Sequence, residues 1–108
     1  DIIFTGDLGY VGTNLLYELL EREGIDIRCR HSDCGTLIFD REKQDVHAGG
    51  SGCGCSASVL CSYIMHRLEK GDFGNILFMS TGALMSPTSS FQGESIPGIA
   101  HLLNIKKD

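Results

Sequence analysis

The sequence predicts an α/β fold in which helices pack against a mixed β-sheet. Short apolar runs typical of strands alternate with segments whose apolar residues recur at helical spacing. Such alternation favours a sheet with helices packed on it. The chain has 108 residues, of which 42% are hydrophobic and 21% charged, so we expect one folded domain or part of one.

The first elements should be a strand at residues 2–5, a glycine-containing turn and a helix. Leucines repeat at helical spacing from position 15 to position 20, with Thr13 or Asn14 as the cap and Gly24 as the stop. The glycines at 6, 9 and 12 lack the spacing of the dinucleotide-binding fingerprint. Plain packing of a strand on a helix is therefore favoured over nucleotide binding.

The next segment is polar, and we expect residues 25–36 to form a surface connection. His31, Asp33 and Cys34 are metal ligands by type, but solvated loop positions are favoured for them. A short strand is predicted at residues 36–39, and the charged residues 40–45 should form a solvated turn.

A glycine-rich loop at residues 47–55 leads into a helix predicted at 56–70. Ser56 is the expected cap, Gly71 the expected stop, and Cys61 lies on the apolar helix face as a predicted core residue. Unpaired amides at such a helix start suit an anion. The alternative is that the glycines only let the backbone pass close to a neighbouring strand.

An apolar strand buried on both faces is predicted at residues 75–81, and a closing strand, also largely buried, at 99–105. The long connection at 82–98 has a length that is often functional. Glu94 is the one charged residue from position 73 to position 105, which suggests an acid, a base or a cation ligand; a capping or surface role is the alternative.

Charge and cysteine usage limit the classes of partner. A net charge of −5 argues against nucleic acid and anionic membranes as direct partners. Five cysteines without a Cys-x-x-Cys pair suit free thiols in a reducing compartment. The chain opens directly on a strand, which suggests a piece of a longer protein.

Three segments resemble the stage V sporulation protein AD family: residues 45–57 (DVHAGGSGCGCSA), 80–89 (STGALMSPTS) and 92–101 (QGESIPGIAH). The opening residues 5–9 (TGDLG) are also similar. The resemblance covers nearly the whole chain and is closest to the C-terminal part of that family. It implies a thiolase-like fold, in which residues 1–108 would be a single partial domain, most of the second of two halves.

The resemblance also implies a function, which is non-enzymatic binding of dipicolinic acid (pyridine-2,6-dicarboxylate) during its uptake into the developing spore. No cofactor is expected beyond calcium carried with the ligand. The implied partners are other stage V sporulation A channel proteins, the remainder of the parent chain and a second copy in a homodimer. The implied location is the bacterial spore or forespore, where the protein would be soluble and peripheral to the inner membrane.

The expected ligand site combines amides, hydroxyls, imidazoles and one carboxylate. Glycine amides and serine hydroxyls would hold one carboxylate of the ligand, a histidine the other, and Glu94 the calcium. The candidate ligand-binding residues are His47, Gly49, Gly50, Ser51, Gly52, Cys53, Ser56, Ser86, Thr88, Glu94 and His101.

Two other functions remain open on the residues alone. An acyl transferase of the thiolase type would use a thiol nucleophile, and Cys53 or Cys55 would then carry an acyl group. A zinc site would use Cys53, Cys55 and His47, although the Cys-x-Cys spacing is tighter than in most structural sites.

Overall fold

The computed structural model describes residues 1–47, 54–83, 87–96 and 98–108. Its strands are β1 (Ile2–Thr5), β2 (His31–Asp33), β3 (Asn75–Met79), β4 (Gly82–Ala83), β5 (Gly98–Ile99) and β6 (Leu102–Lys106). Its helical segments are α1 (Gly9–Arg22), η1 (Arg28–Arg30), α2 (Cys34–Leu37), α3 (Cys55–Val59), η2 (Leu60–Ile64), α4 (Met65–Glu69) and α5 (Pro87–Phe91).

The main sheet has four strands in the order β2-β1-β3-β6. Strands β2, β1 and β3 are parallel, with Phe4 opposite Phe78, and β6 runs antiparallel to β3. A separate two-stranded pair joins β4 to β5. The predicted α/β class with a mixed sheet is therefore confirmed.

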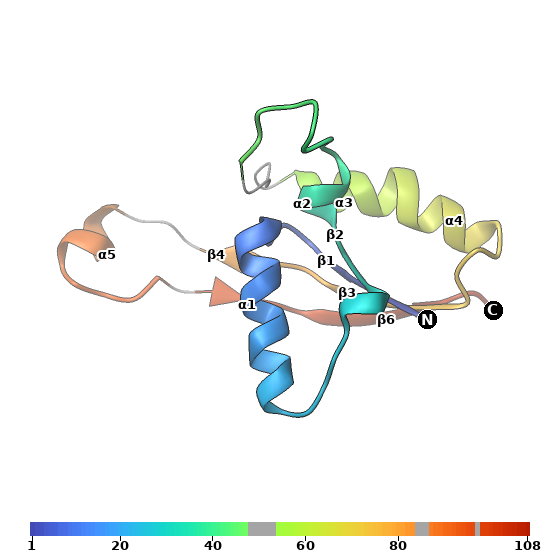
Figure 1. Cartoon of the computed structure of the whole chain (residues 1–108), viewed down its shortest axis with the longest axis horizontal. Helices are drawn as coiled ribbons and strands as arrows, with labels where there is room; N and C mark the ends of the chain where they lie inside the picture. Colours follow the sequence, from blue (N-terminus) through green and yellow to red (C-terminus); the bar gives the residue numbers. More distant parts are fainter. Residues whose placement is uncertain (48–53, 84–86, 97) are drawn as a thin grey trace.

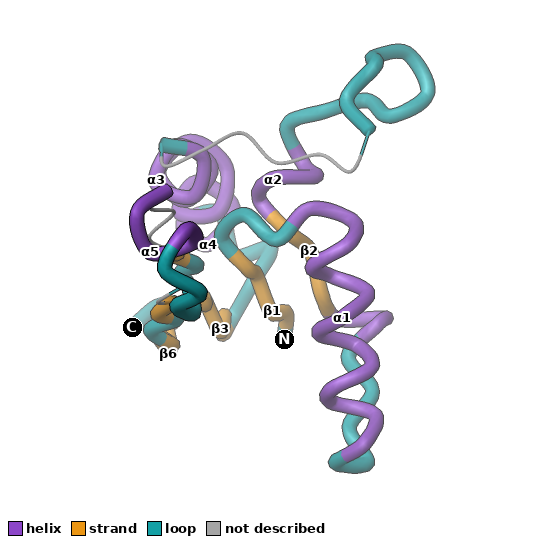
Figure 2. The backbone as a smooth tube through the Cα atoms, turned by 90° about the vertical axis from the view of Figure 1, so that its left-hand side faces the viewer, coloured by secondary structure: helices purple, strands orange, loops and turns teal. Residues whose placement is uncertain are grey.

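Helices cover both faces of the sheet. Figures 1 and 2 show α1 on one side and the continuous helical segment from α3 to α4 on the other. This placement follows from the right-handed connections between parallel strands, because the chain moves outward from β1 to β2 and then back past β1 to β3. The two sides differ in character, since the side of the α3–α4 segment is apolar and the side of α1 holds a polar cluster.

The apolar core lies between the sheet and the α3–α4 segment. Alternate residues Phe4, Ile76 and Phe78 point toward Val59, Ile64 and Leu68, and each is at most 5% exposed. The ring of Phe73 closes this core edge-on against Phe4, with centroids 5.7 Å apart. Full burial of each such side chain is favourable by about 1.5–3 kcal/mol, so this face holds most of the apolar stabilisation.

A turn of π-helix, η2, interrupts the helix that packs on this core. The buried residues of the helix are Cys55, Val59, Ile64 and Leu68, which follow one another at intervals of four, five and four. The amide of Met65 donates to the carbonyl of Leu60, and the extra residue in that turn brings Ile64 back into line with Val59. Cys61 is exposed as a result, so its predicted core position is wrong.

The predicted element boundaries hold in part. The strand at 2–5 is confirmed, and Gly24 and Gly71 follow the helix ends with φ of +77° and +86°. Helix α1 starts at Gly9 with Leu8 at the N-cap position, so the predicted cap at Thr13 or Asn14 is wrong.

Residues 31–33 form a strand and 34–37 a helix, so the predicted surface connection at 25–36 and the predicted strand at 36–39 are wrong there. Strand β6 is mostly exposed, with only Ile105 partly buried against the core, so its expected burial is also wrong.

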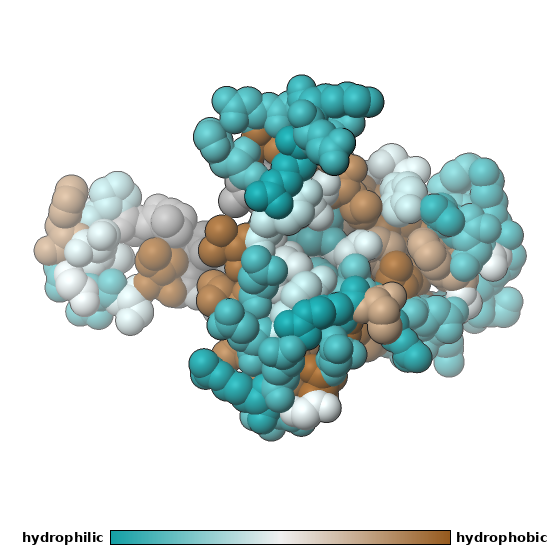
Figure 3. All heavy atoms as spheres, in the orientation of Figure 1, coloured by the Kyte–Doolittle hydropathy of each residue, from teal (hydrophilic) through white to brown (hydrophobic). Residues whose placement is uncertain are grey.

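The predicted long connection is an arm that carries β4, α5 and β5 away from the sheet (Figure 1). Apolar side chains are exposed on the arm and on α1, where Val11, Leu15 and Leu19 form one stripe with 63%, 55% and 58% exposure. Figure 3 shows apolar residues over both regions. Among the described helices, none has the length and apolar character that crossing a bilayer requires.

Candidate functional site

The carboxyl ends of β1 and β3 meet the first turn of α3 at Gly6. A Cβ placed on Gly6 would lie 3.0 Å from the amide nitrogen of Thr81 and 3.1 Å from both its Oγ1 and the Cβ of Ser56. The amide of Gly6 also donates to the carbonyl of Met79 at 2.9 Å. Open α/β sheets bind ligands outside the carboxyl ends of their strands, which makes this strand-end edge the first candidate site.

Asp33 organises the neighbouring polar cluster from the end of β2. Its side chain is 2% exposed and accepts three hydrogen bonds, from Thr5 Oγ1 at 2.5 Å and from the amides of Leu8 at 2.9 Å and Gly9 at 3.1 Å. The carboxylate therefore caps the start of α1 from another strand, where the helix dipole favours negative charge. This contact explains why α1 begins at Gly9 without a capping side chain of its own.

His31 extends the cluster toward α1. Its Nε2 lies 2.9 Å from Thr5 Oγ1 and its Nδ1 lies 2.9 Å from the hydroxyl of Tyr17. The hydroxyl of Thr5 donates its hydrogen bond to Asp33, so it can only accept from His31. The neutral imidazole therefore donates from Nε2 to Thr5 and accepts a hydrogen bond from the Tyr17 hydroxyl at Nδ1. Burial lowers the pKa of His31 despite the charge of Asp33, and burial also raises the pKa of Tyr17.

Gly35 lets two carboxylates approach the same strand end. A Cβ on Gly35 would collide with Oδ1 of Asp7 and lie 3.0 Å from Oδ2 of Asp33. A larger residue at this position would require the carboxylate of Asp7 to move. The absence of a side chain at Gly35 therefore leaves room for both carboxylates at this strand end.

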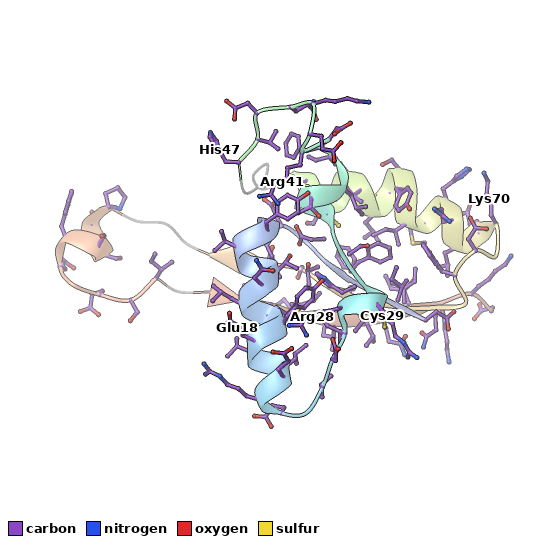
Figure 4. All side chains as sticks on the ribbon, in the orientation of Figure 1. Glu18, Arg28, Cys29, Arg41, His47 and Lys70 are labelled. Atoms are coloured by element: carbon purple, nitrogen blue, oxygen red, sulfur yellow. The ribbon has the colours of Figure 1, made fainter. Side chains whose placement is uncertain are left out.

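A separate open hollow of about 660 Å³ lies between α1 and the turn at residues 40–47. Its walls include Tyr10, Val11 and Asn14 from the helix and Arg41, Val46 and His47 from the turn. The guanidinium carbon of Arg41 lies 4.3 Å from the centroid of the Tyr10 ring. Figure 4 shows Arg41 reaching from the turn toward the start of α1, with His47 further along the same turn.

The structure distributes the described candidate residues over three places. Ser56 lies at the strand-end edge, and the carbonyl of His101 accepts the amide of Ser80 at 3.1 Å beside that edge. His47 lines the hollow, whereas Thr88 and Glu94 lie on the arm, away from α3 (Figure 1). The candidates Gly49, Gly50, Ser51, Gly52, Cys53 and Ser86 lie outside the described residues.

Ser56 does not act as the predicted cap. Helix α3 starts at Cys55 after Gly54, and no side chain makes a capping hydrogen bond there. Ser56 instead stands in the first turn of the helix, where its Cβ faces Gly6. Its position at the edge is therefore set by helix packing and not by capping.

The thiols of the described residues differ in access. Cys29 and Cys61 are exposed, whereas Cys34 and Cys55 are buried, and all four are free. Burial raises the pKa of Cys34 to about 12, which makes its thiol a poor nucleophile. No group of three or more His, Cys, Asp or Glu side chains within the described ranges is arranged for a metal ion.

Several residues that build the edge were not singled out from the sequence. Gly6 and Thr81 each follow an apolar strand, and such positions in parallel strands meet at one edge. Asp33 was expected in a solvated loop, because its strand has three residues, His-Ser-Asp, without apolar character. Gly6 follows the strand predicted at 2–5 and Thr81 is the last residue of the strand predicted at 75–81, and these positions are the signal that was available.

Comparison with known proteins agrees with the sequence motifs. The family model for "Stage V sporulation protein AD (SpoVAD)" matches residues 1–106. Stage V sporulation protein AD of Bacillus subtilis (strain 168) is 46% identical over 101 residues, which cover 94% of this chain and 30% of that relative. The chain thus spans about a third of the length of the curated relative that it matches. On the match over residues 1–106, the chain belongs to the stage V sporulation protein AD family.

Proposed function

We propose that this chain serves sporulation as part of a protein that binds dipicolinic acid and assists its uptake into the developing spore, without catalysing a reaction. The observation that carries the proposal is the family match over residues 1–106. Because the chain spans 30% of the Bacillus subtilis relative, the proposal concerns the part of the binding site that this region supplies.

The chemistry of the strand-end edge supports an anionic ligand. Dipicolinate is a small, planar dianion, and a chain with net charge −5 does not attract it at long range. Short-range donors must therefore hold it. The Oγ1 of Thr81 and the Cβ of Ser56 stand beside Gly6, and the glycine-rich residues 49–52 precede α3 closely in the chain. Amides and hydroxyls of this kind bind carboxylates without adding an unpaired charge to the site.

We further infer that the chain is one partial domain, most of the second half of a thiolase-like body. The mixed sheet with helices on both faces supports this inference. So does the exposed apolar stripe of α1, which is the kind of surface that another part of the protein or a second copy covers. The remainder of the protein and other stage V sporulation A proteins are the proposed partners.

Calorimetry of the full-length protein with dipicolinate tests the binding proposal. Gly50→Asp and Ser51→Asp place a new negative charge in the glycine-rich stretch, and each should weaken binding by about tenfold or more, because like charges repel at close range. Ser62→Asp is the matched control, since Ser62 is exposed on the helical segment that follows the glycine-rich stretch, and its hydroxyl donates to the carbonyl of Ser58. Unchanged affinity in the two loop variants, or no binding by the wild-type protein, would count against the proposal.

A further inference from the structure

We propose that the hollow between α1 and the turn at residues 40–47 is a second ligand site, which binds a planar aromatic carboxylate. The hollow is separate from the edge formed by Gly6, Ser56 and Thr81, so the inference does not depend on the proposed function. It starts from the charge of Arg41. Among the described residues, the ion pairs join Arg28, Lys43, His47 and Arg67 to carboxylates, and Arg41 is in none of them.

Comparison with the other stacked arginines shows what distinguishes Arg41. Arg28 lies 5.1 Å from the ring centroid of Tyr17 but also pairs with Glu21 and Asp26. Arg67 likewise stacks on Tyr63 and pairs with Asp72. The positive charge of Arg41 is therefore the one among these stacked arginines that remains for an external anion, and a guanidinium can hold a carboxylate through two parallel hydrogen bonds.

The turn that carries Arg41 is fixed by its own hydrogen bonds. The carboxylate of Asp40 accepts the amides of Glu42 at 3.1 Å and Lys43 at 3.3 Å, and the amide of Asp40 donates to Gln44 Oε1 at 2.8 Å. The guanidinium of Arg41 also stacks on the ring of Tyr10, which further fixes its position. A charge held in this way loses little conformational entropy when it binds a ligand.

The remaining walls favour a partly apolar ligand over a bare inorganic ion. Val11 and Val46 supply apolar surface, and Asn14 supplies an amide. Asp45 also lines the hollow and opposes an anion, but its carboxylate lies 3.5 Å from His47 Nε2 and is 91% exposed, so solvent screens it. Small-molecule sites commonly combine apolar walls with a few polar groups in this way.

The left-handed backbone of His47 is a second observation at the same place. His47 has φ of +49°, and it is the only residue other than glycine with positive φ among those that the structure describes. Such a conformation is uncommon in residues other than glycine and is found repeatedly at ligand sites. It holds the imidazole at the rim of the hollow, where it can donate a hydrogen bond to a second polar group of the ligand.

Fluorine NMR of 4-fluorobenzoate with the full-length protein tests the inference, because line broadening of the ligand reports weak binding. Arg41→Gln should lower the affinity about tenfold, which is the usual loss for a hydrogen-bonded charge. Arg41→Lys should restore part of it, since the charge remains while the planar fork is lost. Benzoate should displace the probe better than cyclohexanecarboxylate, because both carry one negative charge and only benzoate is flat.

Arg28→Gln is the matched control, since it removes another exposed arginine that stacks on a tyrosine. It should leave the broadening unchanged, and so should Ser51→Asp, which changes the glycine-rich stretch of the proposed dipicolinate site. The inference is overturned if the wild-type protein does not broaden the probe, or if Arg41→Gln binds as well as Arg28→Gln. Loss of dipicolinate binding in Ser51→Asp with retained probe binding would support both sites separately.

Discussion

The carboxylate of Asp33 gives the sharpest test of how the edge is held together. Three donors end on it: the hydroxyl of Thr5 and the amides of Leu8 and Gly9. Each hydrogen bond to a charged, buried acceptor contributes about 1.5–3 kcal/mol. Asp33→Asn keeps one acceptor oxygen but places an NH₂ group against a donor, so at least one donor loses its partner. We expect the free energy of unfolding to fall by about 2–3 kcal/mol.

Denaturant unfolding measures this loss, and Asp40→Asn is its matched control. Asp40 also accepts two backbone amides, from Glu42 and Lys43, but it is exposed to solvent. Asparagine caps an exposed turn nearly as well as aspartate, so the control should lose less than about 0.5 kcal/mol. Equal losses in the two variants would refute the idea that burial and charge make Asp33 the organising residue of the edge.

Three further predictions follow from burial and exposure. Burial lowers the pKa of His31, so its contribution to stability is complete above about pH 6.5 and declines as the pH falls from there toward the folded pKa; His31→Gln should flatten the pH dependence of unfolding in that window. Iodoacetamide should label Cys61 and spare Cys34 in the native protein, as peptide mass mapping would show, and labelling of both at equal rates would contradict their assigned burial. The isolated chain should self-associate through the stripe on α1, and Leu15→Lys combined with Leu19→Lys should reduce its sedimentation coefficient.

The parts of the fold that were predictable are those in which the local pattern and the tertiary environment agree. The apolar run at β1, the position of the central strand β3 and the glycines after the helices match their predictions. Leu77 and Met79 are only half-buried, so the predicted burial of β3 on both faces is wrong. These segments bury apolar side chains or need a left-handed residue, and both requirements are visible in a single sequence.

The unpredicted parts depend on contacts between distant segments. Strand β2 is His-Ser-Asp, which has no apolar periodicity, and it forms because Thr5 and α1 supply partners for its polar side chains. The face of the helix from α3 to α4 was misjudged at Cys61, because a π-turn adds one residue to the helical repeat. Neither the polar partners of β2 nor the π-turn of η2 can be recognised from the residues of the segment itself.

The candidate site shows the same division. Ser56 was expected near the ligand as a helix cap, and it lies at the edge for a different reason, its packing against Gly6. Arg41 was expected in a solvated turn and Tyr10 was given no role, because their pairing joins two segments that lie about thirty positions apart. Only the tertiary structure shows that the turn at 40–47 folds over the start of α1.

We propose that dipicolinate binds where the glycine-rich stretch enters the helix beside the ends of β1 and β3. A crystal of the full-length protein soaked with dipicolinate tests it most directly. We expect ligand density against residues 49–52, in contact with Ser56 or Thr81. Ligand density elsewhere would contradict this proposal. So would the absence of ligand density together with hydrogen bonds from the amides of 49–52 to neighbouring main chain.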